Sequence, residues 1–210
     1  AVTYMVVAGN KIYVSGWLPD DNTSNFMVFD TSGDLISEFS ADPAQNKSDE
    51  KTFAVDSVGN VYVSYSYGGA EIINVFDYTD GDLIDTWAFS TPATEDHSYI
   101  TIDNGELVTM GTLEEDSTHS VIQRYSLNGT LLSTISDELE YNGYIAVDSD
   151  TNYYVSDFNG NLAKYNSSGV LQVVRGSFGT ADGQLKYPEG ISHDTSGNIY
   201  VLSDVIGVSN

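Results

Sequence analysis

The chain has 210 residues, of which 31 are acidic and only 7 are basic, so its formal charge is −24, and it contains no cysteine. This charge excludes nucleic-acid binding through a basic face, and the lack of cysteine excludes disulfide scaffolds, thiolate metal sites and thiol nucleophiles. No apolar run approaches the roughly 18 residues needed to span a bilayer, so we expect no membrane insertion of this segment.

A turn followed by an apolar strand recurs five times along the chain. A shorter apolar strand precedes each turn, at residues 4–7, 53–56, 100–103, 145–148 and 191–194. One position of the strand after the turn is tyrosine in four of the five copies. The residues at this position are Tyr13, Tyr62, Val108, Tyr154 and Tyr200, at intervals of 46 to 49 residues. Most of the turns contain Gly-Asn or a related pair. Because Gly and Asn accept positive φ at little cost, each copy predicts a tight β-hairpin.

A second hairpin follows the first in four of the five copies. Its turn is marked by Gly33, Gly81, Gly129 and Gly169, each with a leucine two residues later. The unit is therefore four antiparallel strands in about 46 residues, which is typical of a propeller blade. Helical periodicity is absent, so we expect no helix longer than one turn. A β-sandwich also has short strands, but it would not repeat the same four-strand unit at a constant spacing.

The predicted fold class is all-β: a β-propeller of four-stranded antiparallel blades, with four full blades and half of a fifth. We assign residues 1–210 to a single propeller domain, with repeats at approximately 1–40, 41–90, 91–137, 138–178 and an incomplete 179–210. Half a blade leaves unpaired backbone groups at a sheet edge. We therefore expect the chain to be part of a longer polypeptide that completes the fifth blade and adds a sixth. The alternative is a partner subunit that donates the missing strands.

The segment 176–204 resembles a named repeat family. It reads Gly-Ser-Phe-Gly at 176–179, Asp-Gly-Gln-Leu at 182–185, Pro-Glu-Gly-Ile at 188–191 and Gly-Asn-Ile-Tyr-Val at 197–201. This is similar to an NHL repeat, and the other four copies keep only its turns and strands. The resemblance implies a β-propeller, most often six-bladed, that serves as a binding platform and occasionally as a lyase or lactone hydrolase.

The connections of a blade fall on two faces. The turns within its first and last strand pairs lie on one face, and they are tight in this sequence. The connections between strands two and three and between blades lie on the other, which we call the long-loop face. They are long at residues 16–25, 40–52, 90–98, 111–120, 136–143 and 176–189. Because binding residues accumulate on loops of a rigid scaffold, we predict a recognition surface there.

Aromatic and acidic side chains are interleaved in these long connections. Aromatic rings could stack on sugars while carboxylates accept hydrogen bonds from their hydroxyls, and the acidic loops could bind Ca²⁺; no other cofactor is expected. The alternative is solvated acidic loops with aromatics that pack against blade edges. The candidate ligand-binding residues are Trp17, Asp20, Asp21, Tyr65, Tyr67, Glu114, Asp116, Tyr141, Phe158 and Tyr187.

A catalytic or metal site receives little support. His97 and His119 share the long-loop face of the third repeat, but no third histidine is nearby, and His193 occupies an apolar strand position where we expect a core residue. The innermost strand positions offer no ligand set, since they are Val6, Ala54, Thr101, Ala146 and Ser192. We therefore predict that the protein is not an enzyme. The alternative is a metal-dependent propeller enzyme of the lyase or lactonase type.

The distribution of charge predicts an environment of high salt, and the sequons predict a location outside the cell. The 21 Asp and 10 Glu residues are spread along the whole chain, and such self-repulsion destabilises a compact state unless salt screens it. This favours a halophilic system, archaeal or viral. Sequons at Asn22, Asn46, Asn128 and Asn166 favour an extracellular location. The predicted function is a recognition, adhesion or assembly module on a cell surface or virion, with a glycan, a protein or neighbouring subunits as partner.

Overall fold

The computed structural model describes residues 2–18, 23–40, 49–67, 70–89, 94–113, 116–140, 142–194 and 196–203, and for some strand ends it describes the backbone alone. The chain divides into a first compact unit, residues 1–91 with 127–129, and a second, residues 92–126 with 130–210. The units are treated separately below. None of the described residues belongs to a helix that could cross a membrane.

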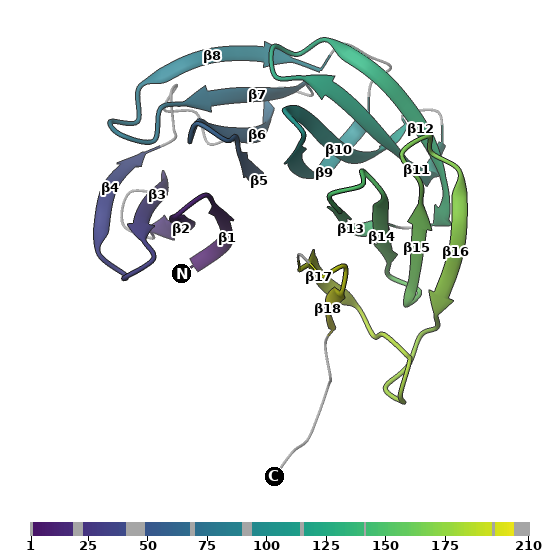
Figure 1. The fold of residues 1–210 in the computed structure, drawn as a ribbon. Coiled ribbons are helices and arrows are strands. Elements are labelled where there is room, and N and C mark those ends of the chain that lie inside the picture. The colour runs from purple at the N-terminus through teal and green to yellow at the C-terminus, as the bar shows by residue number, and fades with distance from the viewer. Residues whose placement is uncertain are drawn as a thin grey trace. The chain divides into compact units, whose positions relative to one another are not determined.

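The first unit contains two four-stranded antiparallel sheets (Figure 1), in which neighbouring strands follow chain order. The first sheet consists of β1 (Val2–Ala8), β2 (Lys11–Leu18), β3 (Thr23–Asp30) and β4 (Leu35–Ser40). The second consists of β5 (Asp49–Val55), β6 (Val61–Tyr67), β7 (Ala70–Phe76) and β8 (Leu83–Ala88).

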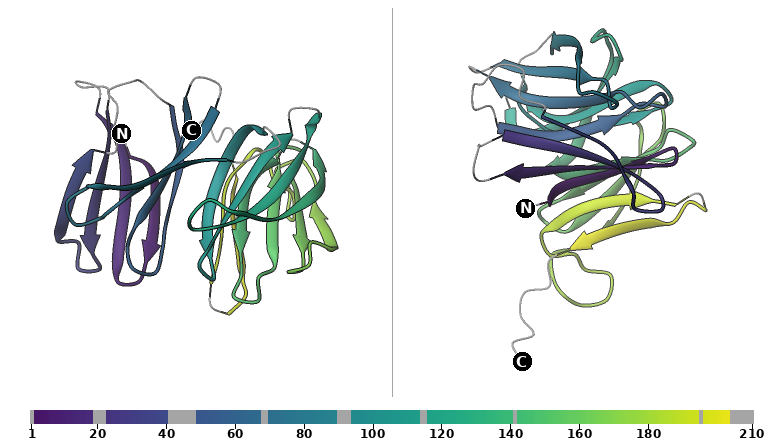
Figure 2. Two further views of the ribbon diagram at one scale, coloured as in Figure 1. Left: turned by 90° about the horizontal axis from the view of Figure 1, so that it is seen from above. Right: turned by 90° about the vertical axis from the view of Figure 1, so that its left-hand side faces the viewer.

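The second unit contains two further four-stranded sheets and one pair of strands. These are β9 (Thr94–Asp103), β10 (Glu106–Leu113), β11 (Asp116–Ser126) and β12 (Leu131–Glu140), then β13 (Asn142–Val147), β14 (Tyr153–Asp157), β15 (Asn161–Tyr165) and β16 (Leu171–Gly176), and finally β17 (Pro188–His193) with β18 (Ile199–Ser203). Figure 2 shows the strands of each sheet lying side by side with the usual twist. The prediction of four complete blades and half of a fifth is confirmed.

Aromatic and branched side chains hold neighbouring sheets together. In the first unit Phe26, fully buried on β3, meets the edge of Phe53 on β5 at 5.0 Å between ring centroids and stacks on Phe39 of β4 at 5.4 Å. In the second unit Ala146 and Tyr154 of the fourth sheet pack against Ile191 of β17. These side chains can meet because successive residues of a strand point to opposite faces of its sheet, so every second side chain points at the adjacent sheet.

Three of the hairpins are closed by the same arrangement of Asp, Asn and Tyr, which we call the Asp clamp. In the turn before β14, one Asp148 oxygen accepts the backbone N–H groups of Asp150 and Asn152 at 3.0 and 2.9 Å. The other oxygen accepts the Asn152 amide at 2.9 Å and the Tyr154 hydroxyl at 3.0 Å. Asp56 closes the turn before β6 in the same way, and Asp194 the turn before β18.

Candidate functional site

The long-loop face is built differently from the sequence-based expectation. Several segments predicted as long loops are strand, because the hairpin strands keep pairing toward this face: Trp17 pairs with Ser24, and Thr112 with Ser120. Residues 94–98 belong to β9, and β12 extends to Glu140. The prediction of long loops at 16–25, 90–98, 111–120 and 136–143 is therefore wrong for most of their residues. The long connection that the structure does describe is 177–187, between β16 and β17.

The structure describes only some of the predicted ligand-binding residues, and only two of them with their side chains. Asp20, Asp21, Glu114 and Tyr141 lie outside the described residues. Phe158 and Tyr187 are described, and both are about half exposed. For the remaining four the structure gives strand positions without side chains: Trp17 on β2, Tyr65 and Tyr67 on β6, and Asp116 on β11.

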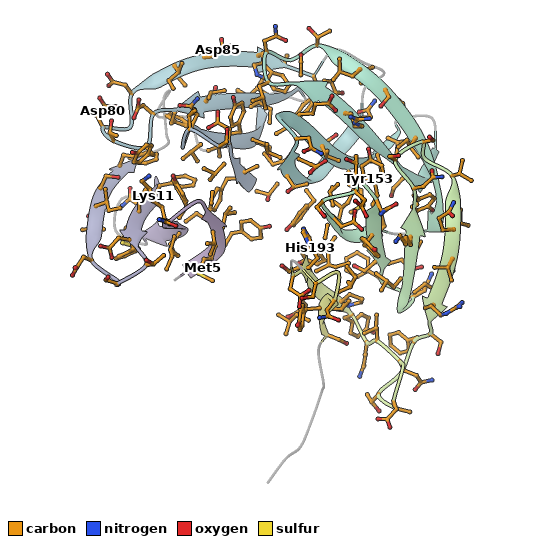
Figure 3. All side chains as sticks on the ribbon, viewed as in Figure 1. Met5, Lys11, Asp80, Asp85, Tyr153 and His193 are labelled. Carbon is orange, nitrogen blue, oxygen red and sulfur yellow. The ribbon has the colours of Figure 1, made fainter. Side chains whose placement is uncertain are left out.

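The histidines are not brought together by the described backbone register. His97 of β9 pairs with Gly111 of β10, and His119 of β11 pairs with Glu140 of β12, so β10 lies between the strands of the two histidines. His193 on β17 (Figure 3) is half-buried rather than the core residue we expected, and its Nδ1 lies 3.3 Å from the Asp194 carbonyl oxygen. The described residues contain no group of three or more His, Asp or Glu side chains that could hold a metal ion.

The glycosylation candidates also divide between the described residues and the rest. Asn22 and Asn46 lie outside the described residues. Asn128 is exposed in the turn between β11 and β12. Asn166 begins the turn between β15 and β16, where its side-chain oxygen accepts the backbone N–H groups of Ser168 and Val170 at 3.1 and 2.9 Å.

The connection 177–187 is internally closed by hydrogen bonds. Leu185 donates its N–H to the Ser177 carbonyl at 3.0 Å, and Gly179 donates to the Leu185 carbonyl at 3.2 Å. The Gln184 side chain spans the loop, accepting the Ala181 N–H at 3.1 Å and donating to the Ser177 hydroxyl at 3.3 Å. These hydrogen bonds close the loop on itself.

The turn between β14 and β15 is packed tightly on this loop. A Cβ added to Gly160 would lie 2.4 Å from the Leu185 carbonyl oxygen and 2.7 Å from that of Ser177. Gly160 also has φ +79°, so a side chain there would be strained for two reasons. The turn that carries Phe158, two residues before Gly160, therefore packs through its glycine on the 177–187 connection.

Tyr187 is held in a backbone conformation that a bulky residue rarely adopts. Its φ is +48°, and its ring is 45% exposed. The preceding residue is clamped to β18, because Lys186 donates its N–H to the Ser203 hydroxyl at 2.7 Å and its carbonyl accepts that hydroxyl at 2.8 Å. A left-handed conformation at a large side chain costs free energy, so the surrounding contacts must hold it in place.

Three half-exposed aromatic side chains are carried by the turn between β14 and β15 and by the 177–187 connection, and we call Phe158, Phe178 and Tyr187 the aromatic patch. The rings of Phe178 and Tyr187 meet edge to face, with 5.3 Å between centroids. Each of the three side chains is 45–47% exposed. Phe158 and Tyr187 were predicted as ligand-binding residues, and the ring contact adds Phe178, an aromatic residue of the same long connection. The sequence signal for this group of residues was the spacing of Tyr and Phe around a Gly-rich loop.

A polar cluster lies at the tight-turn end of the second unit, away from the aromatic patch, and no sequence pattern predicted it. Thr151 donates to an Asp103 carboxylate oxygen at 3.2 Å and accepts the Asn104 amide at 3.0 Å, which links the third and fourth sheets. Asn104 and Thr151 have φ values of +48° and +59°. Burial raises the pKa of the Asp103 carboxyl above its ordinary value.

The same region contains half-buried and buried polar groups from two sheets. Arg124 of β11 pairs with Glu106 of β10. Tyr153 of β14 (Figure 3) is fully buried, and its hydroxyl has no hydrogen-bond partner among the described residues. Burial raises the pKa of Tyr153 above its ordinary value. The described side chains around Tyr153 thus form a packed polar joint between sheets rather than an open ligand site.

Comparison with known proteins identifies the fold and no more. No protein-family model matches the sequence, and no curated protein matches it, so the NHL resemblance stays a prediction. Among solved structures, the Dos1 propeller is similar with a TM-score of 0.59 at 10% identity, over 95% of this chain and 52% of the Dos1 chain. A Bacteroides caccae protein of unknown function has a TM-score of 0.56 at 16% identity, over 94% of this chain and 63% of its own.

A third similar structure is an enzyme. Glutaminyl cyclase of Myxococcus xanthus has a TM-score of 0.56 at 12% identity, over 95% of this chain and 84% of the cyclase. The present chain spans about half the length of the Dos1 propeller chain and under two thirds of the Bacteroides protein. At these identities the likeness shows the β-propeller fold alone, since one fold supports many functions.

Proposed function

We propose that this chain is a recognition module: a β-propeller displayed on a cell surface or virion that binds a glycan through the aromatic patch on its long-loop face. The observation that carries the proposal is Tyr187, a half-exposed aromatic residue held at φ +48°. Strained backbone of this kind concentrates at ligand-binding positions, where the strain is maintained because it aims a side chain.

The chemistry of the patch suits a sugar ligand. Aromatic rings offer flat apolar faces to the C–H groups of a sugar ring, while neighbouring polar groups can reach its hydroxyls. The three aromatic side chains stand on a closed loop and a tight turn, so little conformational entropy would be lost on binding. A protein ligand and neighbouring subunits of an assembly are the competing partners.

Two finer assignments belong to the same proposal. The fifth repeat is of the NHL type, on the residues of 176–204 that resemble that family. The system is halophilic, because 31 acidic side chains against 7 basic ones require screening to remain compact. No described group of residues favours the alternative of a metal-dependent lyase or lactonase.

The halophilic assignment has a direct test in thermal unfolding. The Debye length falls from about 10 Å at 0.1 M salt to about 3 Å at 1 M, so repulsion among the carboxylates weakens strongly over this range. We expect the Tm to rise substantially between about 0.1 M and 1 M KCl. A Tm that stays flat or falls would remove the assignment without affecting the binding proposal.

The glycan proposal is tested by binding to an immobilised panel of glycans, followed by titration calorimetry of those that bind, in about 1 M KCl. Tyr187→Asn is the informative variant, because asparagine tolerates positive φ and so removes the ring without adding backbone strain. We expect this variant and Phe178→Ala to bind about tenfold more weakly or worse.

Leu35→Ala is the matched control, since Leu35 is 54% exposed on β4 of the first unit and the substitution likewise removes a large apolar side chain. It should bind like the wild type. The proposal is wrong if no glycan binds, or if Tyr187→Asn binds as tightly as the control. Binding of a protein but no glycan would replace the glycan by a protein ligand.

A further inference from the structure

Lys186 stands directly beside the aromatic patch. Its Nζ lies 5.8 Å from the centroid of the Tyr187 ring, on the same short segment that Ser203 clamps to β18. No carboxylate among the described residues forms a salt bridge with this ammonium group. The cation is therefore placed next to the patch without a charged partner in the described part of the protein.

Arg175 provides a second cation, near the end of β16, the strand that leads into the connection with Phe178 and Tyr187. In the register of β15 and β16 it pairs with Leu162, and paired residues project from the same face of a sheet. Leu162 packs against the cluster of Ala146, Tyr154 and Ile191, so this face is the one that meets β17. Arg175 is exposed there, and its described hydrogen bond is to the neighbouring Val174 carbonyl, at 3.0 Å.

The backbone brings Arg175 close to the rest of the patch. The next residue, Gly176, approaches the Phe158 turn so closely that an added Cβ would lie 2.4 Å from the Gly160 carbonyl oxygen. Arg175 therefore lies at the end of β16 from which the connection with Phe178 and Tyr187 begins.

The charge of this segment differs from that of the chain as a whole. Residues 175–189 contain two basic side chains, Arg175 and Lys186, and two acidic ones, Asp182 and Glu189. The whole chain has 7 basic and 31 acidic side chains. Elsewhere an anionic ligand meets an excess of carboxylates, whereas here it meets a locally neutral surface with two cations that no described carboxylate neutralises.

We propose that the ligand of the aromatic patch is a polysaccharide that carries carboxylates, a uronic-acid polymer in chemical class, and this inference rests on the proposed function. The sugar rings stack on Phe178 and Tyr187, and Arg175 and Lys186 bind the carboxylates. A guanidinium matches a carboxylate with two parallel hydrogen bonds. Molar salt weakens such contact-range pairs less than it weakens the repulsion from distant acidic side chains, because the latter act over more than a Debye length.

The test compares two probes with the same sugar backbone, one anionic and one neutral: an oligogalacturonate and the same oligosaccharide with its carboxylates methyl-esterified. Titration calorimetry in about 1 M KCl gives the Kd of each. We expect the acid form to bind at least about tenfold more tightly than the ester, since a hydrogen bond to a charged group is worth more than a neutral one. Arg175→Gln and Lys186→Gln should each reduce this preference.

Lys11→Gln is the matched control, because Lys11 also lies over a tyrosine ring, with its Nζ 4.6 Å from the Tyr78 centroid, in the first unit. It should leave the preference intact. Equal binding of the two probes, or a preference that Arg175→Gln and Lys186→Gln leave unchanged, would overturn the carboxylate inference while glycan recognition stands. If neither probe and no neutral glycan binds, the proposed function fails as well.

Discussion

The turns before β14 and before β18 have the same local structure but different surroundings. In both, an aspartate accepts two backbone N–H groups, an asparagine amide and a tyrosine hydroxyl. Yet Tyr154 is 9% exposed and Tyr200 is 58% exposed. Two residues further along each strand, Ser156 is fully buried and Leu202 is 64% exposed.

The difference arises from the adjacent sheet. Tyr154 forms a buried cluster with Ala146 and with Ile191 of β17, and Ile199 and Val201 of β18 pack against this cluster. The face of β18 that carries Tyr200 and Leu202 has no sheet packed on it in the described part of the chain. The comparison teaches that the Asp clamp forms from local hydrogen bonds alone, whereas burial of its tyrosine depends on a neighbouring sheet.

The largest expected effect is a loss of packing between these two sheets. Ile191→Ala removes a side chain that is 8% exposed and touches Ala146 and Tyr154, so we expect the free energy of unfolding to fall by about 2–4 kcal/mol. Leu202→Ala removes a similar number of atoms from an exposed position and should change it by less than about 0.5 kcal/mol. Urea unfolding followed by circular dichroism measures both, and equal losses would contradict the comparison.

A smaller effect is expected when the clamp itself is broken. Asp148→Ala leaves the Asn152 amide and the Tyr154 hydroxyl without their acceptor beside a packed sheet, and we expect a loss of about 1–2 kcal/mol. Asp194→Ala breaks the same bonds at an exposed turn, where water replaces the carboxylate, so its effect should be smaller. A larger loss for Asp194→Ala would show that the clamp does not depend on its surroundings as we infer.

The smallest expected effect is a pH dependence shared by the two turns. Hydrogen bonds from the side chain and backbone of Asn198 lower the pKa of Asp194 to about 2. At Asp148 burial opposes ionisation, but the hydrogen bonds from Asn152 and Tyr154 outweigh it and lower the pKa below its ordinary value. Because both native pKa values lie below those of the unfolded chain, the stability they contribute is complete above about pH 4 and is lost as the pH falls through the native pKa.

Carbon-detected NMR titration of the carboxyl groups checks this directly, with a midpoint for Asp194 expected near its pKa of about 2. Asp148→Asn and Asp194→Asn should each make the fall of the unfolding free energy between about pH 4 and pH 2 less steep. An Asp194 midpoint near 3.8, the ordinary pKa of an aspartate, would mean that the clamp does not form in solution.

The sequence by itself determined the repeat, the turns and the order of the strands. Gly33, Gly81, Gly129 and Gly169 were predicted to turn the second hairpins, and all four have positive φ. A turn depends on the conformations and hydrogen bonds of four to six consecutive residues, so it can be read from their types. The same holds for the Asp clamp, whose donors lie within six positions of their aspartate.

The tertiary structure alone decided which residues meet and which remain exposed. Hairpin strands that keep pairing turned most of the predicted long loops into strand. The approach of Gly160 to Leu185 brought the turn that carries Phe158 onto the connection that carries Phe178 and Tyr187. Burial separated Tyr154 from Tyr200, although both sit in the same motif. These properties depend on contacts between residues distant in sequence, and the free energy of such contacts is set by the packing of whole sheets, which no local pattern specifies.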